Sequence, residues 1–177
     1  MDSLWDLMEG ARNCVRGYTR VKSGEKVCIW TDRSSEVDPR VVEAFGVAVF
    51  ELEGWEADDV IGTLSAQAEK MGLDSVILTG DRDTFQLISP KVRVDLASSI
   101  QDRKVYDEEA LQDRYSGLTA SQQTDFKALL GDTSDNIPGV PKVGEKTAIA
   151  LLNDYQNLEG LYEHLEEVTR PSVKSSL

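Results

Sequence analysis

Histidine and cysteine are scarce in this chain, whose 177 residues include one histidine and two cysteines. Cys14 and Cys28 follow no metal-binding or redox spacing, and in a reducing compartment such cysteines act as small buried apolar residues. His164 lies in a stretch with amphipathic helical spacing and is interpreted as a surface or packing residue. We therefore place none of these three side chains in a functional site.

Long hydrophobic runs are also missing. No stretch of about 18 apolar residues could span a membrane, and the N-terminal residues lack the basic region of a secretory signal. We therefore expect an intracellular, cytoplasmic protein without a membrane partner. A hydrophobic content of 40% is enough for an ordinary core, in one domain or in a domain with a small appendage.

Positive charge is in short supply, because 19 lysines and arginines face 32 aspartates and glutamates, giving a net charge of −13. Proteins that bind nucleic acids usually carry an excess of basic residues. Divalent cations bound among converging acids would, however, offset much of the negative charge. The net charge is therefore only weak evidence against a nucleic-acid partner.

The hydrophobic pattern predicts an α/β fold followed by a helical tail. Repeated strand–helix–strand units indicate a mainly parallel sheet with helices on both faces, and Val92, Val94 and Leu96 alternate as in a half-exposed edge strand. Strands are expected at 27–30, 47–52 and 75–79, and helices at 4–15, 41–45, 57–71, 108–115, 120–130, 146–152 and 158–168.

Three short acidic segments stand where strands end or helices begin, at 54–59, 80–83 and 131–136. Ligands of such sheets sit at the carboxyl ends of the strands, and all three segments are compatible with that edge. Clustered carboxylates are the ligands of hard divalent cations. The segments hold seven carboxylates: Glu56, Asp58, Asp59, Asp81, Asp83, Asp132 and Asp135.

Each acidic segment taken alone also has a purely structural interpretation. The acids at 56–59 could cap a helix, those at 80–83 could form a polar turn neutralised by Arg82, and 132–136 could be an Asx-type turn. Their co-occurrence favours a metal site, because so many carboxylates at one sheet edge would repel one another without cations.

The last acidic segment runs into a glycine-punctuated helical hairpin at 137–148. Helix N-termini favour anions, and glycine allows a close approach of the backbone to a phosphate. A metal cluster beside a phosphate-binding hairpin suggests a nuclease.

The segments 53–62, 77–83 and 127–140 closely resemble the 5′-3′ exonuclease domain of bacterial DNA polymerase I, which belongs to the flap endonuclease family. The resemblance runs from about Pro39 to Lys174. It implies a 5′-nuclease fold of the PIN-like kind followed by a helix-three-turn-helix subdomain at about 132–155.

By this resemblance the seven carboxylates match the family's metal ligands, with Asp58, Asp59, Asp81 and Asp83 in catalytic positions. The family implies two ions, Mg²⁺ or Mn²⁺, a potassium ion at the hairpin, and a DNA partner that is a duplex with a 5′ end, flap or nick. It also implies a polymerase domain in the parent protein. The implied DNA-binding residues are Gly139, Val140, Lys142, Gly144, Lys146 and Thr147.

The opening of the chain departs from the family, which begins with a strand ending in Asp-Gly followed by a helical arch. Only 38 residues precede Pro39, and we expect 1–38 to replace both, with a metal-binding core at 39–106 and a helical DNA-binding part at 107–177. The segment 27–32 stands either for the first strand, making Asp32 a further metal ligand, or for the second, leaving that ligand absent.

Two functions of different classes follow. The first is a two-metal phosphodiesterase acting on DNA near a 5′ end, weakened by loss of the arch, in which the cations generate a hydroxide and stabilise the leaving oxygen. The second is a non-catalytic DNA-binding or scaffold module with the same core. A third alternative, an RNA-directed nuclease of the PIN type, would not carry this hairpin.

Overall fold

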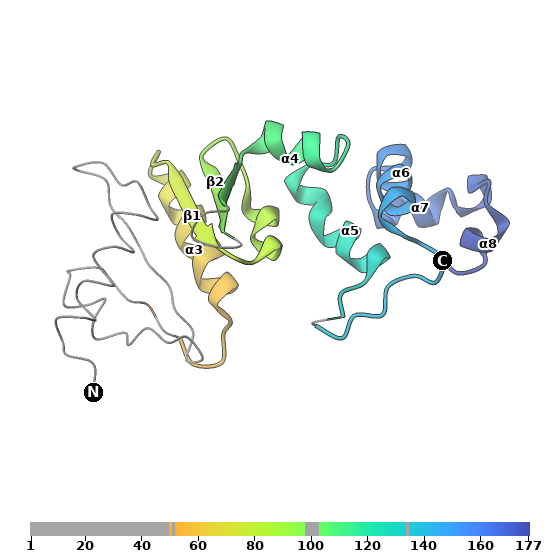
Figure 1. Cartoon of the computed structure of the whole chain (residues 1–177), viewed down its shortest axis with the longest axis horizontal. Coiled ribbons are helices and arrows are strands. Elements are labelled where there is room, and N and C mark those ends of the chain that lie inside the picture. The colour runs from red at the N-terminus through yellow and green to blue at the C-terminus, as the bar shows by residue number, and fades with distance from the viewer. Residues whose placement is uncertain (1–49, 51, 98–102, 134) are drawn as a thin grey trace.

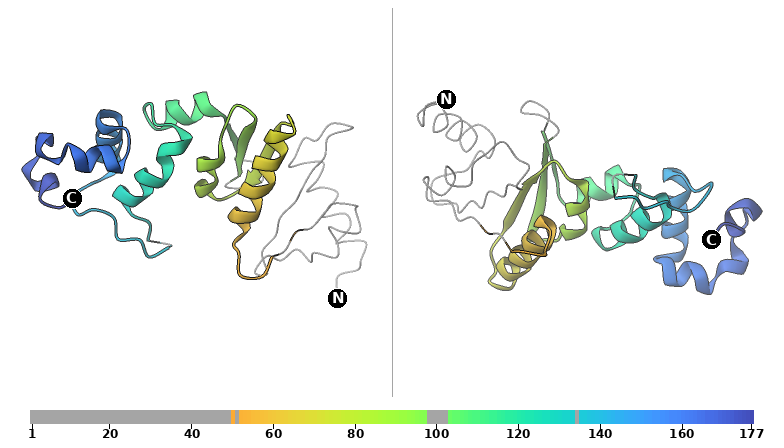
Figure 2. Two further views of the ribbon diagram at one scale, coloured as in Figure 1. Left: turned by 180° about the vertical axis from the view of Figure 1, so that it is seen from behind. Right: turned by 90° about the horizontal axis from the view of Figure 1, so that it is seen from below.

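The computed structural model describes residues 50, 52–97, 103–133 and 135–177. Along its long axis the small sheet and helix α3 lie at one end, α4 and α5 follow in the middle, and α6, α7 and α8 lie at the other end (Figure 1, Figure 2). Asp32, the segments predicted at 4–15, 27–30 and 41–45, and most of the strand predicted at 47–52 lie outside the described residues.

Helix α3, Ala57–Lys70, follows the prediction closely. Glu56 is its N-cap residue and forms a capping box with Asp59, whose carboxylate accepts a hydrogen bond from the Glu56 amide at 3.1 Å. The helix ends at the C-cap Met71, and Gly72 takes a φ of 76°, the left-handed conformation that commonly ends helices.

The described sheet has three strands in the order β1-β2-β3, which are Ser75–Thr79, Val92–Ala97 and Arg103–Tyr106. β1 and β2 are parallel because the chain crosses back between them through the 3-10 helix η2, Arg82–Leu87. β3 returns after a short connection and is therefore antiparallel to β2. The α/β class is confirmed, with a mixed sheet in the part of the chain that the structure describes.

The prediction of a half-exposed edge strand at 92–96 was wrong. β2 lies between β1 and β3, and Val94 is fully buried. Of the two polar residues that produced the alternation, Arg93 is exposed, but Asp95 is buried and forms an ion pair with Arg103 of β3. The alternation of apolar and polar residues indicated an edge strand wrongly, because a carboxylate that is neutralised by an ion pair can also occupy a central strand.

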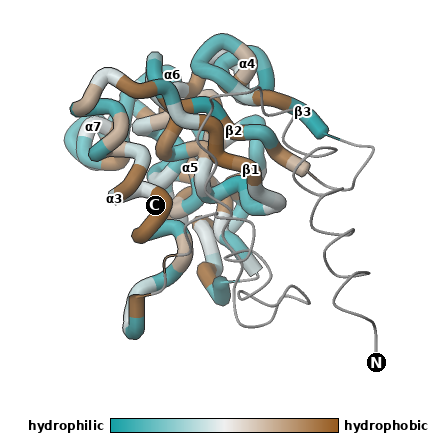
Figure 3. The backbone as a smooth tube through the Cα atoms, turned by 90° about the vertical axis from the view of Figure 1, so that its left-hand side faces the viewer, coloured by the Kyte–Doolittle hydropathy of each residue, from teal (hydrophilic) through white to brown (hydrophobic). Residues whose placement is uncertain are grey.

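One face of the sheet carries the core. Ile77, Val92, Val94 and Tyr106 are buried there, while Val76, Leu78 and Val105 on the opposite face stay largely exposed. The expected second layer of helices is not seen within the described residues. In Figure 3 the hydrophobic stretches of β1 and β2 stand out in brown, whereas α4 and α7 are largely teal.

The helical tail begins after β3, as predicted, although two of the predicted helices are divided. The expected helix at 120–130 is a 3-10 turn η3, Ala120–Gln122, followed by α5, Gln123–Leu130. The one at 158–168 is α7, Leu158–Glu163, followed by η4, Leu165–Glu167. The remaining helices are α4, Glu108–Arg114, α6, Glu145–Tyr155, and α8, Pro171–Lys174. None of the described helices is long and apolar enough to cross a membrane.

A chain of aromatic rings connects the sheet to the helical tail. Phe85 of η2 packs on Tyr106 at 4.6 Å and on Tyr115 at 6.2 Å between ring centroids, and Tyr115 packs on Phe126 at 5.3 Å. All four side chains belong to the hydrophobic core. The Phe85–Tyr115 and Tyr115–Phe126 contacts are edge-to-face, a geometry that is directional as well as apolar. They hold η2 and α5 in a fixed relation, and both elements carry residues of the candidate site.

Candidate metal centre and phosphate-binding helix

The turn after β1 presents Asp81 and Asp83 at the carboxyl edge of the sheet. Asp81 is the N-cap residue of η2, and its carboxylate accepts a hydrogen bond from the Asp83 amide at 2.9 Å. The buried Thr84 hydroxyl donates to the Asp81 carbonyl at 2.7 Å and anchors the turn from below. These bonds fix the Asp81 carboxylate beside Asp83, and an oxygen of each residue lies within 4.8 Å of the other, as expected from their spacing.

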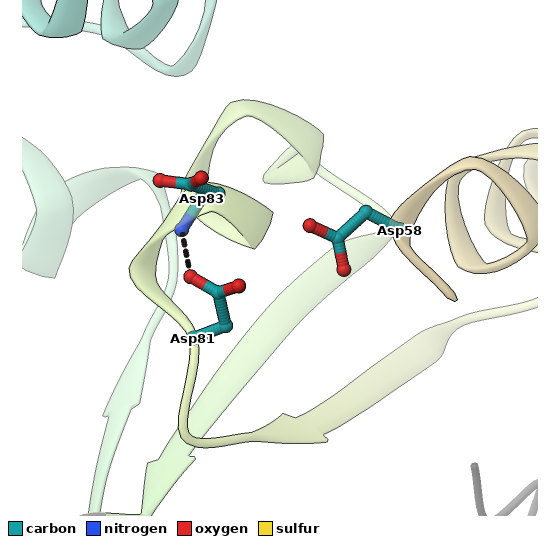
Figure 4. Close-up of side chains that lie close together, drawn as sticks. All are labelled: Asp58, Asp81 and Asp83. Carbon is teal, nitrogen blue, oxygen red and sulfur yellow. Dashed lines mark hydrogen bonds between the residues drawn. The ribbon is translucent and has the colours of Figure 1, made fainter. Parts of the chain in front are cut away.

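Asp58 completes a first group of three carboxylates. It projects from the first turn of α3 toward Asp81 and Asp83 (Figure 4), and one oxygen from each residue lies within 4.8 Å of the others. Partial burial raises the pKa of Asp58, and the negative charges of Asp81 and Asp83 raise it further. We call Asp58, Asp81 and Asp83 the first triad.

A second triad combines Asp83 with Asp132 and Asp135, again with one oxygen from each within 4.8 Å of the others. Asp132 and Ile137 close the loop between them by exchanging two backbone hydrogen bonds of 2.8 and 2.7 Å. Asp83 belongs to both triads. Two groups of hard oxygen ligands that share a carboxylate suit a pair of neighbouring divalent cations.

Lys127 lies among the carboxylates of the second triad. Its Nζ atom is 2.5 Å from Asp135 Oδ2 and 3.2 Å from Asp132 Oδ2, and it also pairs with Asp83 Oδ2. Partial burial lowers the pKa of Lys127, but its hydrogen bonds to Asp135, Asp83 and Asp132 outweigh this effect, so that the net pKa lies above the ordinary value. The ammonium is therefore charged at neutral pH.

Two glycines allow the second acidic loop to fold back on α5. Gly131 and Gly139 have φ values of 83° and 64°, and an added Cβ would lie 2.7 Å from Gly139 N and 2.5 Å from the Leu130 carbonyl group, respectively. Val140 N–H donates to the Leu129 carbonyl at 2.9 Å across the same contact. We predicted that Gly139 meets a phosphate; its backbone is packed against the metal-loop backbone, and a DNA contact there stays a prediction.

Five of the seven predicted ligands thus come together in the two triads. Glu56 and Asp59 stand beside Asp58 but form the capping box of α3 and belong to neither triad. Their role as ligands stays a prediction. Asp32 lies outside the described residues.

The proposed phosphate site is the N-terminus of α6. Gly144 is the N-cap residue, no side chain caps the helix, and an added Cβ at Gly144 would meet nothing within 4 Å. Lys146 is exposed on the first turn beside Thr147. Lys142, three residues before the first residue of the helix, takes a φ of 67°. Open amides and a neighbouring lysine are suited to an anion.

Two basic residues near this helix end were missed by the sequence analysis. Arg114 of α4 donates to Glu145 at 2.8 Å, and Arg170 donates to the Thr147 hydroxyl at 3.2 Å. Arg114, Gly144, Lys146 and Thr147 line an open hollow of about 550 Å³. Lys127 was also missed, although its place in the last turn of α5, just before the acidic loop, was a usable signal.

Repulsion within the first triad predicts an effect of Asp58→Asn on stability. In EDTA, the free energy of unfolding should rise by up to about 1 kcal/mol, because a like charge is removed. Since the pKa of folded Asp58 is raised above 3.8, the wild type should lose stability as pH rises from 3.8 toward 7, and the variant should lose less.

Thermal melts in EDTA at acidic and neutral pH, followed by addition of Mn²⁺, test this prediction. Mn²⁺ should raise the melting temperature of the variant less than that of the wild type, because one ligand is missing. Asp113→Asn on α4 is a control that also removes one aspartate. Equal Mn²⁺ gains for Asp58→Asn and the wild type would mean that Asp58 does not bind the ion.

Solved structures with a similar fold include a bacteriophage T5 5′-exonuclease and the catalytic core of Rad2. A zinc-bound T5 5′-exonuclease has a TM-score of 0.68 at 16% identity, covering 98% of this chain and 76% of that one. The T5 D15 protein co-crystallised with metal ions also has a TM-score of 0.68, at 20% identity over 78% of this chain and 52% of that one. The catalytic core of Rad2 in complex with DNA has a TM-score of 0.53 at 18% identity, with coverages of 77% and 44%. The chain has the 5′-nuclease fold, and divalent metal ions are bound in structures of this fold.

Family comparison is more specific. Residues 34–116 match the 5′-3′ exonuclease N-terminal resolvase-like domain, and residues 118–177 match the 5′-3′ exonuclease C-terminal SAM fold. DNA polymerase I of Bacillus caldotenax is 44% identical over 138 residues, 77% of this chain and 16% of that protein. DNA polymerase I of Chloroflexus aurantiacus is 47% identical over 130 residues, which are 72% of this chain and 14% of that protein. The chain belongs to the 5′-3′ exonuclease family of metal-dependent DNA nucleases and spans about 16% of the length of the first relative.

Proposed function

We propose that this chain hydrolyses DNA phosphodiesters near a 5′ end with the help of two divalent cations, Mg²⁺ or Mn²⁺. The observation that carries the proposal is the pair of carboxylate triads sharing Asp83. The donor set fits, because carboxylate oxygens are preferred by Mg²⁺ and Mn²⁺, and none of the five ligands is a sulfur or nitrogen atom. Family membership gives the reaction class.

The five carboxylates of the two triads are proposed to act by holding the two cations in place. Asp58 and Asp81 would hold one ion, Asp132 and Asp135 the other, and Asp83 would hold both at a fixed spacing. When bound, the ions supply an activated hydroxide and neutralise the leaving oxygen, so that no protein nucleophile is needed. The hydrogen bond from the Asp83 amide holds the Asp81 carboxylate beside Asp83.

DNA is proposed to bind along the helical side of the site. The N-terminal amides of α6, with Lys146 and Arg114 beside them, would contact phosphates of the duplex without reading sequence. Gly139, Val140, Lys142 and Thr147 are proposed to belong to the same contact surface, and a potassium ion could bridge this backbone to a phosphate. A solved complex of the T5 flap endonuclease contains DNA and metal ions.

The experiment that tests the function uses 5′-labelled flap, nicked and single-stranded DNA with the purified chain. Cleavage should occur with Mn²⁺ or Mg²⁺, stop in EDTA, and release products from the 5′ end. Cleavage that persists in EDTA would contradict the metal mechanism. Duplex binding without cleavage, with Mn²⁺ bound, would instead support the alternative of a non-catalytic DNA-binding scaffold.

Lys146→Ala tests the proposed phosphate contact. Duplex affinity should fall by a similar factor for unrelated sequences, and the slope of log affinity against log salt should flatten by about one unit, because one phosphate contact is lost. Fluorescence anisotropy over a salt series measures both quantities.

Lys91→Ala is the matched control for this experiment, since it removes the same charge from a lysine paired with Asp74 at 3.0 Å on the sheet side. If the two variants have the same salt slope as the wild type, the phosphate contact lies elsewhere.

The wider setting of the chain is also a proposal. Its relatives are DNA polymerases I, so we propose that a polymerase domain accompanies this nuclease in the parent protein and that it acts on DNA in the cytoplasm. The two domain boundaries expected at 38/39 and 106/107 stay predictions. A single hydrophobic cluster runs from Ile77 of the sheet to Val173 of α8.

A further inference from the structure

We propose that Lys127 is an internal counter-ion of the second triad, which occupies the cation position and must leave before the second metal ion can bind. This inference rests on the proposed metal role of the triads and adds an order to their filling. The first triad takes an ion directly, whereas the second takes one only in exchange for the Lys127 ammonium.

The contacts of Lys127 are those of a cation in a ligand set. Its Nζ atom lies within ion-pair distance of all three carboxylates of the second triad, at 2.5 Å from Asp135 and 3.2 Å from Asp132, with Asp83 as the third partner. The side chain is only 22% exposed. A divalent ion bound by the same oxygens would take the same space, so that the two cations exclude one another.

The position of the ammonium is set by the fold. Lys127 follows Phe126 in α5, and Phe126 reaches Phe85 of η2 through Tyr115. Asp83 lies two residues before Phe85 on the same 3-10 helix. The aromatic core therefore holds the helix with the lysine against the turn with the shared aspartate. The long, unbranched side chain of Lys127 can still change its rotamer and leave the second triad when a divalent cation binds there.

Lys127 pairs with the shared Asp83, but the other two carboxylates of the first triad have no such counter-ion among the described residues. Neither Asp58 nor Asp81 forms an ion pair with a described lysine or arginine, although an oxygen of each lies within 4.8 Å of the other. Repulsion between these carboxylates favours the binding of an ion at the first triad. At the second triad, the ion must break the Lys127 ion pairs first, and its apparent affinity is lowered by that competition. The two sites should consequently fill in sequence.

Titration with Mn²⁺ alone, without DNA, tests this inference by calorimetry and by the electron paramagnetic resonance signal of free Mn²⁺. The wild type should bind a first ion more tightly than a second. Lys127→Met keeps the length of the side chain and removes the charge. This variant should bind the second Mn²⁺ ion at least about tenfold more tightly than the wild type. The loss of one charge–charge contact near a protein surface is enough to change the affinity by such a factor. The first site should change less.

Lys127→Arg keeps the charge and should leave the second site weak. Lys91→Met is a matched control, because it removes a lysine paired with Asp74 outside both triads and should leave Mn²⁺ binding unchanged. A second site in Lys127→Met that is no tighter than in the wild type would overturn the proposal. Failure of the wild type to bind Mn²⁺ at all would overturn the proposed metal-dependent function itself, and so the two failures differ.

A measurement on the unmodified protein covers the case in which Lys127→Met does not fold. In EDTA, the hydrogen-bonded ammonium of Lys127 should give a protected lysine signal in ¹⁵N-edited spectra. That signal should survive the first equivalent of Mg²⁺ and disappear as the second binds. A signal that persists at saturating Mg²⁺ would overturn the exchange.

Discussion

Asp83→Ala is expected to lower the rate of metal-dependent DNA cleavage by about a thousandfold or more. Asp83 is the carboxylate shared by both triads, so that its loss would weaken both proposed ion sites at once and remove the group proposed to set their spacing. Metal ions contribute several kcal/mol to transition-state stabilisation, and each 1.36 kcal/mol corresponds to about a factor of ten in rate. Single-turnover cleavage of a 5′-flap substrate in Mn²⁺ measures the effect.

The control for Asp83→Ala is Asp74→Ala, which removes an exposed aspartate that pairs with Lys91 outside the triads. Its cleavage rate should stay within about twofold of the wild type, as for a surface substitution of small energetic effect. Circular dichroism should show both variants folded. If Asp83→Ala cleaves at a rate near that of the wild type, Asp83 does not bridge the ions.

Gly139→Ala is expected to destabilise the protein by about 3 kcal/mol or more, and to lower the melting temperature by roughly 6–12 °C. Two causes add. The φ of 64° disfavours any residue with a Cβ, and the added atom would lie 2.5 Å from the Leu130 carbonyl carbon and oxygen. The loop of the second triad must then move away from α5. Thermal melts and Mn²⁺ titration should therefore show lost stability and a weakened second ion site.

Gly144→Ala is the informative partner of this substitution. Its φ of −107° is open to any residue, and an added Cβ meets nothing within 4 Å. We expect a stability change below about 1 kcal/mol and unchanged Mn²⁺ binding. Duplex affinity should fall, because the new methyl group would stand where a phosphate approaches the helix amides. Equal melting temperatures for the two variants would contradict the structural role assigned to Gly139.

Local sequence patterns determined helix α3 and the carboxylate chemistry of the candidate site. The glycine after α3, the apolar spacing of its interior and the capping acids at its start all act over one helical turn, so that they could be read from neighbouring residues. The first triad could be predicted for a similar reason, since acids that follow strands and begin helices gather at one sheet edge. The resemblance of three segments then indicated the nuclease family.

The tertiary structure decided which partner each of these residues has. The place of β2 in the middle of the sheet depends on β3 and on the ion pair between Asp95 and Arg103, which no local pattern reveals. The sharing of Asp83 and the entry of Lys127 into the second triad depend on packing between η2 and α5, from residues 44 apart in the chain. Glycine is likewise required at position 139 because the backbone of Leu130 packs against it. Hydrophobic spacing fixes which side of an element is buried, but contacts between distant elements are set by how their side chains fill space together.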